Sequence, residues 1–180
     1  VGEDLGTIPE GLRAALAASG ILGCRVAMFE RDWQGDGRFL APAETIPTAL
    51  ASWGSHDLPT FAGWRAGRDL DWRARLGELP DPAAARTARA AEVACWDAVA
   101  GPAPDDLVHH LAATPAALVA LQAEDLTGAT EQVNLPGTVH EHPNWRRRLA
   151  IPAEALAELP ALRSAAEIMA AAGRNPEGPT

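Results

Sequence analysis

Cys24-Arg25-Val26-Ala27-Met28-Phe29 is the stretch that decides the fold, because it is a short apolar run that carries one charge. Such a run predicts a buried strand. Two further strands are predicted at residues 49–55 and 117–121. Between and after them lie segments with helical patterns. Strands that alternate with helices favour parallel βαβ units, so the sequence predicts an α/β fold.

The helices are predicted from caps and apolar spacing. Thr7-Ile8-Pro9-Glu10 resembles a capping box with proline in the first turn, and it predicts a helix that ends near Gly20. Further helices are expected to begin at Thr60 and at residue 105 and to occupy 82–99 and 152–173. Three short strands do not complete an eight-stranded barrel, which takes about 250 residues. The order fits the C-terminal half of a TIM (β/α)8 barrel.

Composition narrows the class of partner. Hydrophobic residues make up 47% of the 180 residues, which is enough for a core, and the net charge is −9. A chain this acidic is a poor match for nucleic acid or an anionic membrane surface, whereas a neutral sugar is not disfavoured. No membrane span is visible. Cys24 and Cys95 are expected to be buried, reduced thiols of a cytoplasmic protein. The six tryptophans can fill a core or stack on a sugar ring.

Acidic residues stand at two places where a buried strand would end. The first is Gly2-Glu3-Asp4-Leu5-Gly6 and the second is Ser55-His56-Asp57. In parallel α/β barrels the chemistry gathers at the carboxyl ends of strands, and carboxylates brought together there can do acid/base work. Taken alone, each segment is also compatible with a capping turn or a structural loop.

Four blocks, in the same order along the chain, resemble the amylomaltases, also called disproportionating enzymes (glycoside hydrolase family 77). Any one block alone would be weak evidence, but together they extend over most of the sequence. They are Gly2-Glu3-Asp4-Leu5-Gly6-Thr7-Ile8-Pro9, Gly23-Cys24-Arg25-Val26-Ala27-Met28-Phe29, Ser55-His56-Asp57-Leu58-Pro59-Thr60, and Asn134-Leu135-Pro136-Gly137-Thr138 followed by Asn144-Trp145-Arg146.

The resemblance implies a role for each matching residue. Glu3 matches the general acid/base, and Asp57 matches the carboxylate that holds sugar hydroxyls and stabilises the oxocarbenium-like transition state. His56 matches a substrate-binding histidine. Phe29 matches an aromatic that touches the glucan, although a core phenylalanine closing a strand is the alternative. Asp4 is expected to be a hydrogen-bonding support, and the loop at Asn134 to shape the rim.

The resemblance also implies an activity. It is transfer of an α-1,4-glucan segment from a maltodextrin or glycogen-derived oligosaccharide to another glucan, with retention of configuration and without a metal or organic cofactor. Residues 1–150 would be the C-terminal part of the catalytic barrel, and 151–180 a helical segment of the same domain. The family's nucleophilic aspartate lies upstream, so this chain alone is expected to be inactive. An uncovered strand edge and apolar face predict self-association, packing against a partner, or an ordering of the chain that differs from the parent barrel.

Other interpretations remain open at this stage. An amylase-type hydrolase and a non-catalytic glucan-binding module are the alternative functions. His140 and His142, with Glu141 between them, could hold zinc, but a solvated loop is expected because no third ligand converges. His109 and His110 face different sides of a helix and are not expected to share a metal. Residues 146–148 are expected to form a solvated or salt-bridged helix face.

Overall fold

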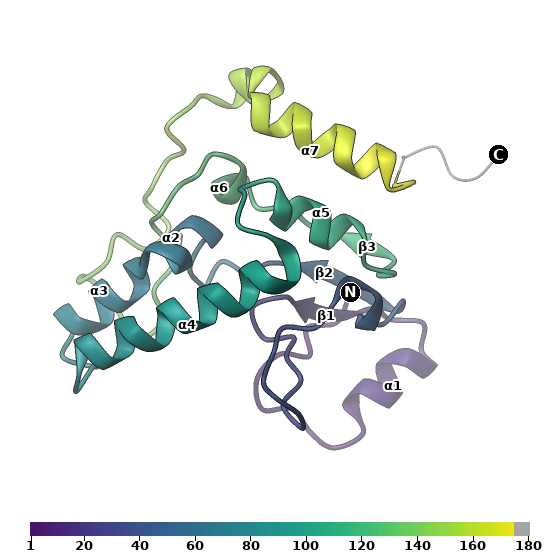
Figure 1. Cartoon of the computed structure of the whole chain (residues 1–180), viewed down its shortest axis with the longest axis horizontal. Helices are drawn as coiled ribbons and strands as arrows, with labels where there is room; N and C mark the ends of the chain where they lie inside the picture. The colour runs from purple at the N-terminus through teal and green to yellow at the C-terminus, as the bar shows by residue number, and fades with distance from the viewer. Residues whose placement is uncertain (175–180) are drawn as a thin grey trace.

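A three-stranded parallel sheet forms the centre of the computed structural model, which describes residues 1–174 (Figure 1). The strands β1 (Gly23–Val26), β2 (Ala49–Ser52) and β3 (Leu118–Val119) are hydrogen-bonded in that order. In the register, Gly23 lies opposite Ala49, and Leu50 lies opposite Leu118. The predicted α/β fold with short parallel strands is therefore confirmed.

The strands are shorter than predicted, because the chain turns as soon as it leaves the sheet. After β1, the Phe29 amide donates to the Val26 carbonyl at 2.8 Å, so residues 27–29 form a turn. After β2, residues 53–57 continue as bends and turns. Both turns follow the carboxyl end of a strand, which places Phe29, His56 and Asp57 in loops.

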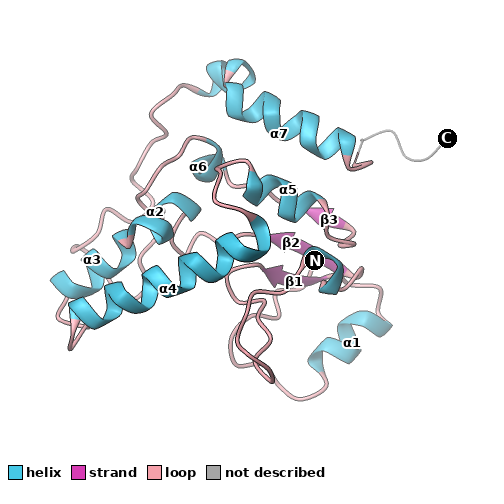
Figure 2. Ribbon diagram, in the orientation of Figure 1, coloured by secondary structure: helices cyan, strands magenta, loops and turns pink. Residues whose placement is uncertain are grey.

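Helices surround the sheet in an uneven way (Figure 2). Only the short 3-10 helix η1 lies between β1 and β2, whereas most of the helical residues follow β2. Figure 1 shows α1 and α7 at opposite ends of the molecule, and α7 packs beside α5. The helices are α1 (Leu12–Ala18), η1 (Pro42–Glu44), α2 (Phe61–Ala66), α3 (Arg68–Arg75), α4 (Pro82–Ala100), α5 (Asp106–Ala112), α6 (Ala123–Leu126), η2 (Ala153–Glu158) and α7 (Pro160–Ala171).

Two local predictions are wrong. Thr7 does not cap α1; the N-cap is Gly11 in the left-handed region at φ 81°, with no side-chain hydrogen bond. The predicted capping box does not form, because residues 5–9 follow the anchored Asp4 as bends and irregular chain, and the helix begins only at Leu12. Residues 146–148 are not helical, because residue 146 ends a turn and 147–148 are irregular, although Arg147 does form a predicted ion pair, with Glu131 at 3.3 Å. By contrast, α4 begins as predicted, with the Asp81 side chain accepting from the Ala84 amide at 2.9 Å.

The core is aromatic and lies between the sheet and the helices that follow β2. Trp53, directly after β2, contacts Phe61, Trp64 and Trp96 with ring centroids about 5 Å apart, mostly edge to face. Such pairs contribute beyond the area that they bury. Trp53, Trp64 and Trp96 are almost fully buried, so these three tryptophans serve packing. No helix of the described residues is both long and apolar enough to cross a membrane.

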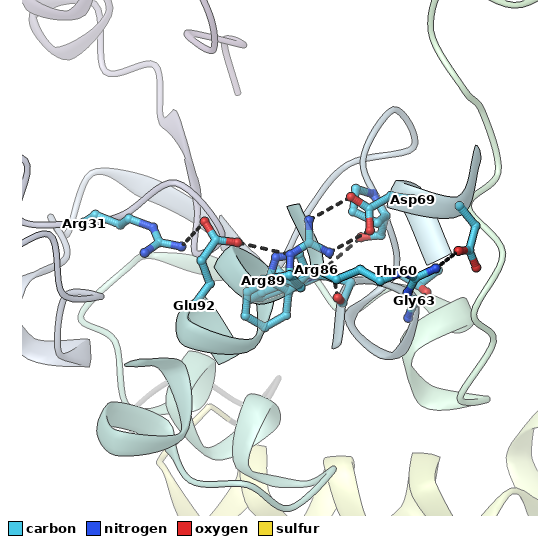
Figure 3. Close-up of polar contacts among 11 residues, drawn as sticks. Arg31, Thr60, Gly63, Asp69, Arg86, Arg89 and Glu92 are labelled. Atoms are coloured by element: carbon cyan, nitrogen blue, oxygen red, sulfur yellow. Dashed lines mark hydrogen bonds and ion pairs between the residues drawn. The ribbon is translucent and has the colours of Figure 1, made fainter. Parts of the chain in front are cut away.

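A row of ion pairs ties the loop after β1 to helices α3 and α4 (Figure 3). Arg31 donates to Glu92, Glu92 accepts from Arg89, and Arg89 makes a two-pronged pair with Asp69 at 2.7 and 2.8 Å. Arg31 also lies over the Phe39 ring at 3.8 Å. The row therefore holds the segment just beyond Phe29 in place.

Candidate active site

Asp4 is the buried polar anchor of the N-terminal segment. Its carboxylate accepts from the Cys24 amide at 2.6 Å and from the guanidinium groups of Arg13 and Arg25, each at 2.9 Å. Burial by itself raises the pKa of Asp4, but the bonds from Arg25, Cys24 and Arg13 outweigh burial, and the pKa lies below its ordinary value. Asp4 thus stays ionised and fixes the neighbouring residue against β1, so its predicted supporting role is confirmed.

Glu3 is exposed beside β1. The Gly2 amide donates to the Leu22 carbonyl at 2.8 Å, so the chain enters alongside the sheet. The pKa of the Cys24 thiol is raised by burial and by the charges of Asp4 and Glu3, which reflects how near Glu3 lies to this strand. Glu3 is thus an exposed carboxylate whose neighbour in the chain, Asp4, is fixed against β1.

Phe29 lines an open hollow of about 500 Å³ at the carboxyl end of β1. The hollow also includes Leu5 and Gly6, which follow Glu3 closely in sequence, and the exposed Trp33. Phe29 is 46% exposed, so the alternative of a core phenylalanine is wrong. Glu30 lines the same hollow, and burial raises its pKa although Arg25 and Arg13 oppose the shift. Glu30 was not singled out from the sequence, although it directly follows the strand predicted to end at Phe29.

His56 and Asp57 form one polar cluster beyond the carboxyl end of β2. His56 Nε2 lies 3.4 Å from Asp57 Oδ1, and the Asn134 side-chain amide donates to the same oxygen at 2.6 Å. The Asn134 backbone amide donates to the His56 carbonyl at 3.1 Å. Both side chains of the pair are about half exposed. One oxygen of Asp57 is thus held in place, and the other is available to a ligand hydroxyl.

Trp145 completes this cluster from a distant part of the chain. Its ring centroid lies 5.1 Å from that of His56, and 63% of its surface is exposed. Neither Asn134 nor Trp145 was predicted to contact a sugar. The Asn134 and Asn144-Trp145-Arg146 segments were visible in the sequence, but their contact with His56 and Asp57 required the tertiary structure.

The structure places the predicted residues in segments next to two neighbouring strands. Phe29 and Glu3 belong to the region around β1, and His56 and Asp57 belong to the loop after β2, which pairs directly with β1. Within residues 1–174, no hydrogen bond or ion pair links Glu3 to either member of the His56–Asp57 pair. A shared sugar site for Glu3 and Asp57 stays a prediction.

The cysteine and histidine predictions were only partly right. Cys24 and Cys95 are free, but Cys24 is half-buried and Cys95 is exposed. His142 is buried rather than solvated: its ring packs on Trp72, with centroids 4.8 Å apart, and its Nδ1 bonds Asn144 Oδ1 at 2.7 Å. Among residues 1–174, no three His, Cys, Asp or Glu side chains group closely enough to hold a metal ion.

The protein is thus of the α/β class. Carboxylates and exposed aromatic rings lie in the loops that follow its parallel strands, and the cluster of His56, Asp57, Asn134 and Trp145 lies beyond β2. The sequence profile described as 4-alpha-glucanotransferase matches residues 1–153. The chain therefore belongs to the 4-alpha-glucanotransferase family.

Individual relatives agree with this assignment. A 4-alpha-glucanotransferase of Mycobacterium tuberculosis is 37% identical, over 84% of this chain and 23% of its own length. One from Haemophilus influenzae is 28% identical, over 84% of this chain and 24% of its own length. The chain thus spans about a quarter of the length of these relatives.

Solved structures show the same fold. An amylomaltase from Corynebacterium glutamicum superposes with a TM-score of 0.80 and 28% identity, over 93% of this chain and 28% of that chain. An amylomaltase from Streptococcus agalactiae, in complex with acarbose, superposes with a TM-score of 0.63 and 22% identity, over 96% of this chain and 31% of that chain.

Proposed function

We propose that the protein to which this chain contributes transfers an α-1,4-glucan segment from a maltodextrin donor to the 4-hydroxyl of another glucan. The observation that carries the proposal is the Asp57 cluster, in which Asn134 holds one carboxylate oxygen at 2.6 Å beside His56 and the exposed ring of Trp145. A carboxylate with a free oxygen suits sugar hydroxyls, and a flat aromatic suits the apolar face of the ring. Membership in the 4-alpha-glucanotransferase family supports the same reaction.

In the proposed mechanism, Glu3 is the acid/base. It protonates the leaving glucan oxygen, and it later takes the proton of the acceptor's 4-hydroxyl. Asp57 bonds hydroxyls of the sugar and stabilises the positive charge of the transition state. Configuration is retained through a covalent glycosyl intermediate on the nucleophile. Phe29 and His56 contact the glucan.

We infer that the chain assayed by itself is inactive, since the family's nucleophilic aspartate, in its Arg-x-Asp context, has no match in the sequence. Residues 1–150 are proposed to form the C-terminal part of a (β/α)8 barrel, and 151–180 a helical segment of the same domain. Helices η2 and α7 support the second part as far as residue 174, and residues 175–180 lie outside the described residues. The exposed side chain of Leu118 on β3 supports self-association of the isolated chain.

A cytoplasmic location is likewise a proposal, supported by the free thiols of Cys24 and Cys95.

The test uses maltotriose. The intact protein is expected to give both longer oligomers and shorter sugars, and the Glu3→Gln variant is expected to lose roughly 10²- to 10⁴-fold in rate, the usual contribution of a general acid–base. The chain alone is expected to give no products. Efficient disproportionation by the chain alone would contradict the assignment of a missing nucleophile. Full turnover by Glu3→Gln would overturn the acid/base role, and glucose release without longer oligomers would favour the amylase-type hydrolase.

A further inference from the structure

Trp145 combines features that packing does not explain. It is a large aromatic residue, yet it is 63% exposed. Its φ of 59° lies in the left-handed region, and it is the only non-glycine residue there among residues 1–174. Bulky L-residues rarely adopt this conformation, and strained residues of this kind gather at ligand sites where the surrounding structure holds them.

The surrounding loop does hold the residue. The Trp145 amide donates to the Val133 carbonyl at 3.1 Å. Its neighbour Asn144 accepts from the Leu135 amide at 2.9 Å and donates to both oxygens of Thr138, at 2.9 and 3.1 Å. The buried His142 ring adds a further bond to Asn144 at 2.7 Å. On the other side, the Arg146 amide donates to the Pro143 carbonyl at 3.1 Å, so the backbone around the indole is fixed and the strained conformation persists.

The fixed indole lies against the polar cluster of His56 and Asp57. Its centroid is 5.1 Å from that of His56, at an interplanar angle of 43°, and His56 Nε2 lies 3.4 Å from Asp57 Oδ1. The rings of Trp145 and His56 are thus tilted toward one another rather than stacked flat; Trp145 is largely exposed and His56 about half exposed. A pyranose ring presents an apolar face and a rim of hydroxyls. The Trp145 indole offers a flat surface for the apolar face of the sugar, and His56 and Asp57 offer polar groups for its hydroxyls.

We propose that Trp145 is a sugar-stacking platform that sets the affinity of the site for the glucose unit next to Asp57. The inference rests on the proposed glucan-binding function and adds to it a specificity-determining residue. Trp145 binds the ring in the ground state and in the transition state alike, so it acts chiefly on KM and leaves most of kcat in place.

The experiment separates stacking from folding by using two substitutions in the intact protein. Asn tolerates the left-handed region, so Trp145→Asn removes the ring while relieving strain. It is expected to raise the KM for maltotriose about tenfold, with kcat reduced less than about threefold and Tm unchanged or higher. Trp145→Phe keeps a ring and is expected to recover most of the affinity. Val139→Ala, at an exposed apolar residue of the same loop, is the matched control and should match the wild type.

A second measurement keeps this proposal separate from the catalytic one. Binding of maltoheptaose is measured by calorimetry in the Glu3→Gln background, where turnover plays no part. Weaker binding in Trp145→Asn supports the platform even if the protein proves not to transfer glucans. Equal binding with and without the indole overturns it, even if Glu3→Gln abolishes transfer. A fall in Tm for Trp145→Asn, together with unchanged KM, would also overturn it, because the ring would then serve packing.

Discussion

The single hydrogen bond from Asn134 to Asp57 shows how residue-scale geometry shapes this site. Asp57 is about half exposed, so in isolation its carboxylate would rotate freely. The 2.6 Å bond from the Asn134 amide removes that freedom, and the Asn134 backbone holds His56 through a separate bond. Asn134 therefore positions both Asp57 and His56. Only the bond to Asp57 depends on the Asn134 side chain, because the bond to His56 comes from the backbone.

Asn134→Ala is expected to lower kcat/KM of the intact protein about 10- to 100-fold, the range for a lost hydrogen bond to a charged group. The backbone bond to His56 remains, so Tm should change little. Asn134→Asp should be worse, because a second carboxylate beside Asp57 cannot donate and repels its charge. The check is steady-state kinetics on maltotriose beside thermal unfolding, and wild-type kinetics in both variants would disprove the orienting role.

The start of helix α2 shows how elements are joined. Thr60 caps the helix by accepting from the Gly63 amide at 3.0 Å, and its hydroxyl donates to the Ala129 carbonyl at 2.6 Å. Asp125 of α6 accepts from the Phe61 amide at 2.7 Å. Gly63 is required here, because a Cβ would collide with the Thr130 carbonyl. The first turn of α2 is thus built by residues more than sixty positions away.

Asp125 makes stability depend on pH. Burial is the main cause that raises its pKa from 3.8 to about 6, and it lines a cavity of about 380 Å³ between α2, α5 and α6. Burying the ionised carboxylate of Asp125 lowers the free energy of unfolding. Because the pKa of Asp125 is higher in the folded state than in the unfolded state, this cost is absent below about pH 4, where the group is protonated in both states. It grows as the pH rises toward about 6 and then stays constant.

Asp125→Asn, which keeps an acceptor for the Phe61 amide, should therefore raise the free energy of unfolding at pH 7 by up to about 3 kcal/mol and change it little near pH 4. Denaturant unfolding at the two pH values measures this. An equal change in the free energy of unfolding at pH 4 and at pH 7 would contradict the raised pKa of Asp125. Asp125→Ala also removes the acceptor for the Phe61 amide, so its free energy of unfolding at pH 7 should rise less than that of Asp125→Asn.

Arg89 links three helices. It makes the two-pronged pair with Asp69 of α3, bonds Glu92 within α4, and donates to the Trp64 carbonyl of α2 at 2.7 Å. Arg89 and Asp69 are each only 13% exposed. Arg89→Ala should cost about 3–5 kcal/mol, because it leaves Asp69 buried and unpaired.

Arg86→Ala is the matched control on the same helix, because Arg86 pairs with Asp71 at a solvent-exposed position. Its loss should be only about 0–1 kcal/mol. Arg89→Lys should fall between the two, since lysine keeps the charge without the planar fork. The free energies of unfolding of the three variants decide this, and similar losses for Arg86→Ala and Arg89→Ala would refute the argument.

At the scale of the whole molecule, the C-terminal segment is held by a few specific contacts. Ala165 of α7 is 2% exposed, and α7 packs on α5. Arg174 donates to the Ala112 carbonyl at 2.8 Å, to the Ala116 carbonyl at 3.0 Å and to the Thr114 carbonyl. These carbonyls belong to the end of α5 and the turn before β3, so Arg174 joins the tail to the sheet.

Arg174→Ala should release the end of α7. We expect faster amide hydrogen exchange over residues 160–171, with little change in β1 and β2. Arg163→Ala, which removes an exposed pair with Glu158, is the control and should leave exchange in α7 largely as in the wild type. If exchange rises uniformly over the sheet, Arg174 supports the whole fold rather than the tail.

The sequence by itself determined the local features: three apolar strand segments, the parallel arrangement favoured by helical segments around them, and the Glu3 and His56–Asp57 motifs. These follow from composition and spacing within a few residues. Only the tertiary structure decided that Asn134 meets Asp57 across 77 positions, that Phe29 is exposed, and that Trp145 is strained and faces His56. The reason is physical: contacts between residues distant in the chain depend on how elements pack, and no local periodicity records that packing.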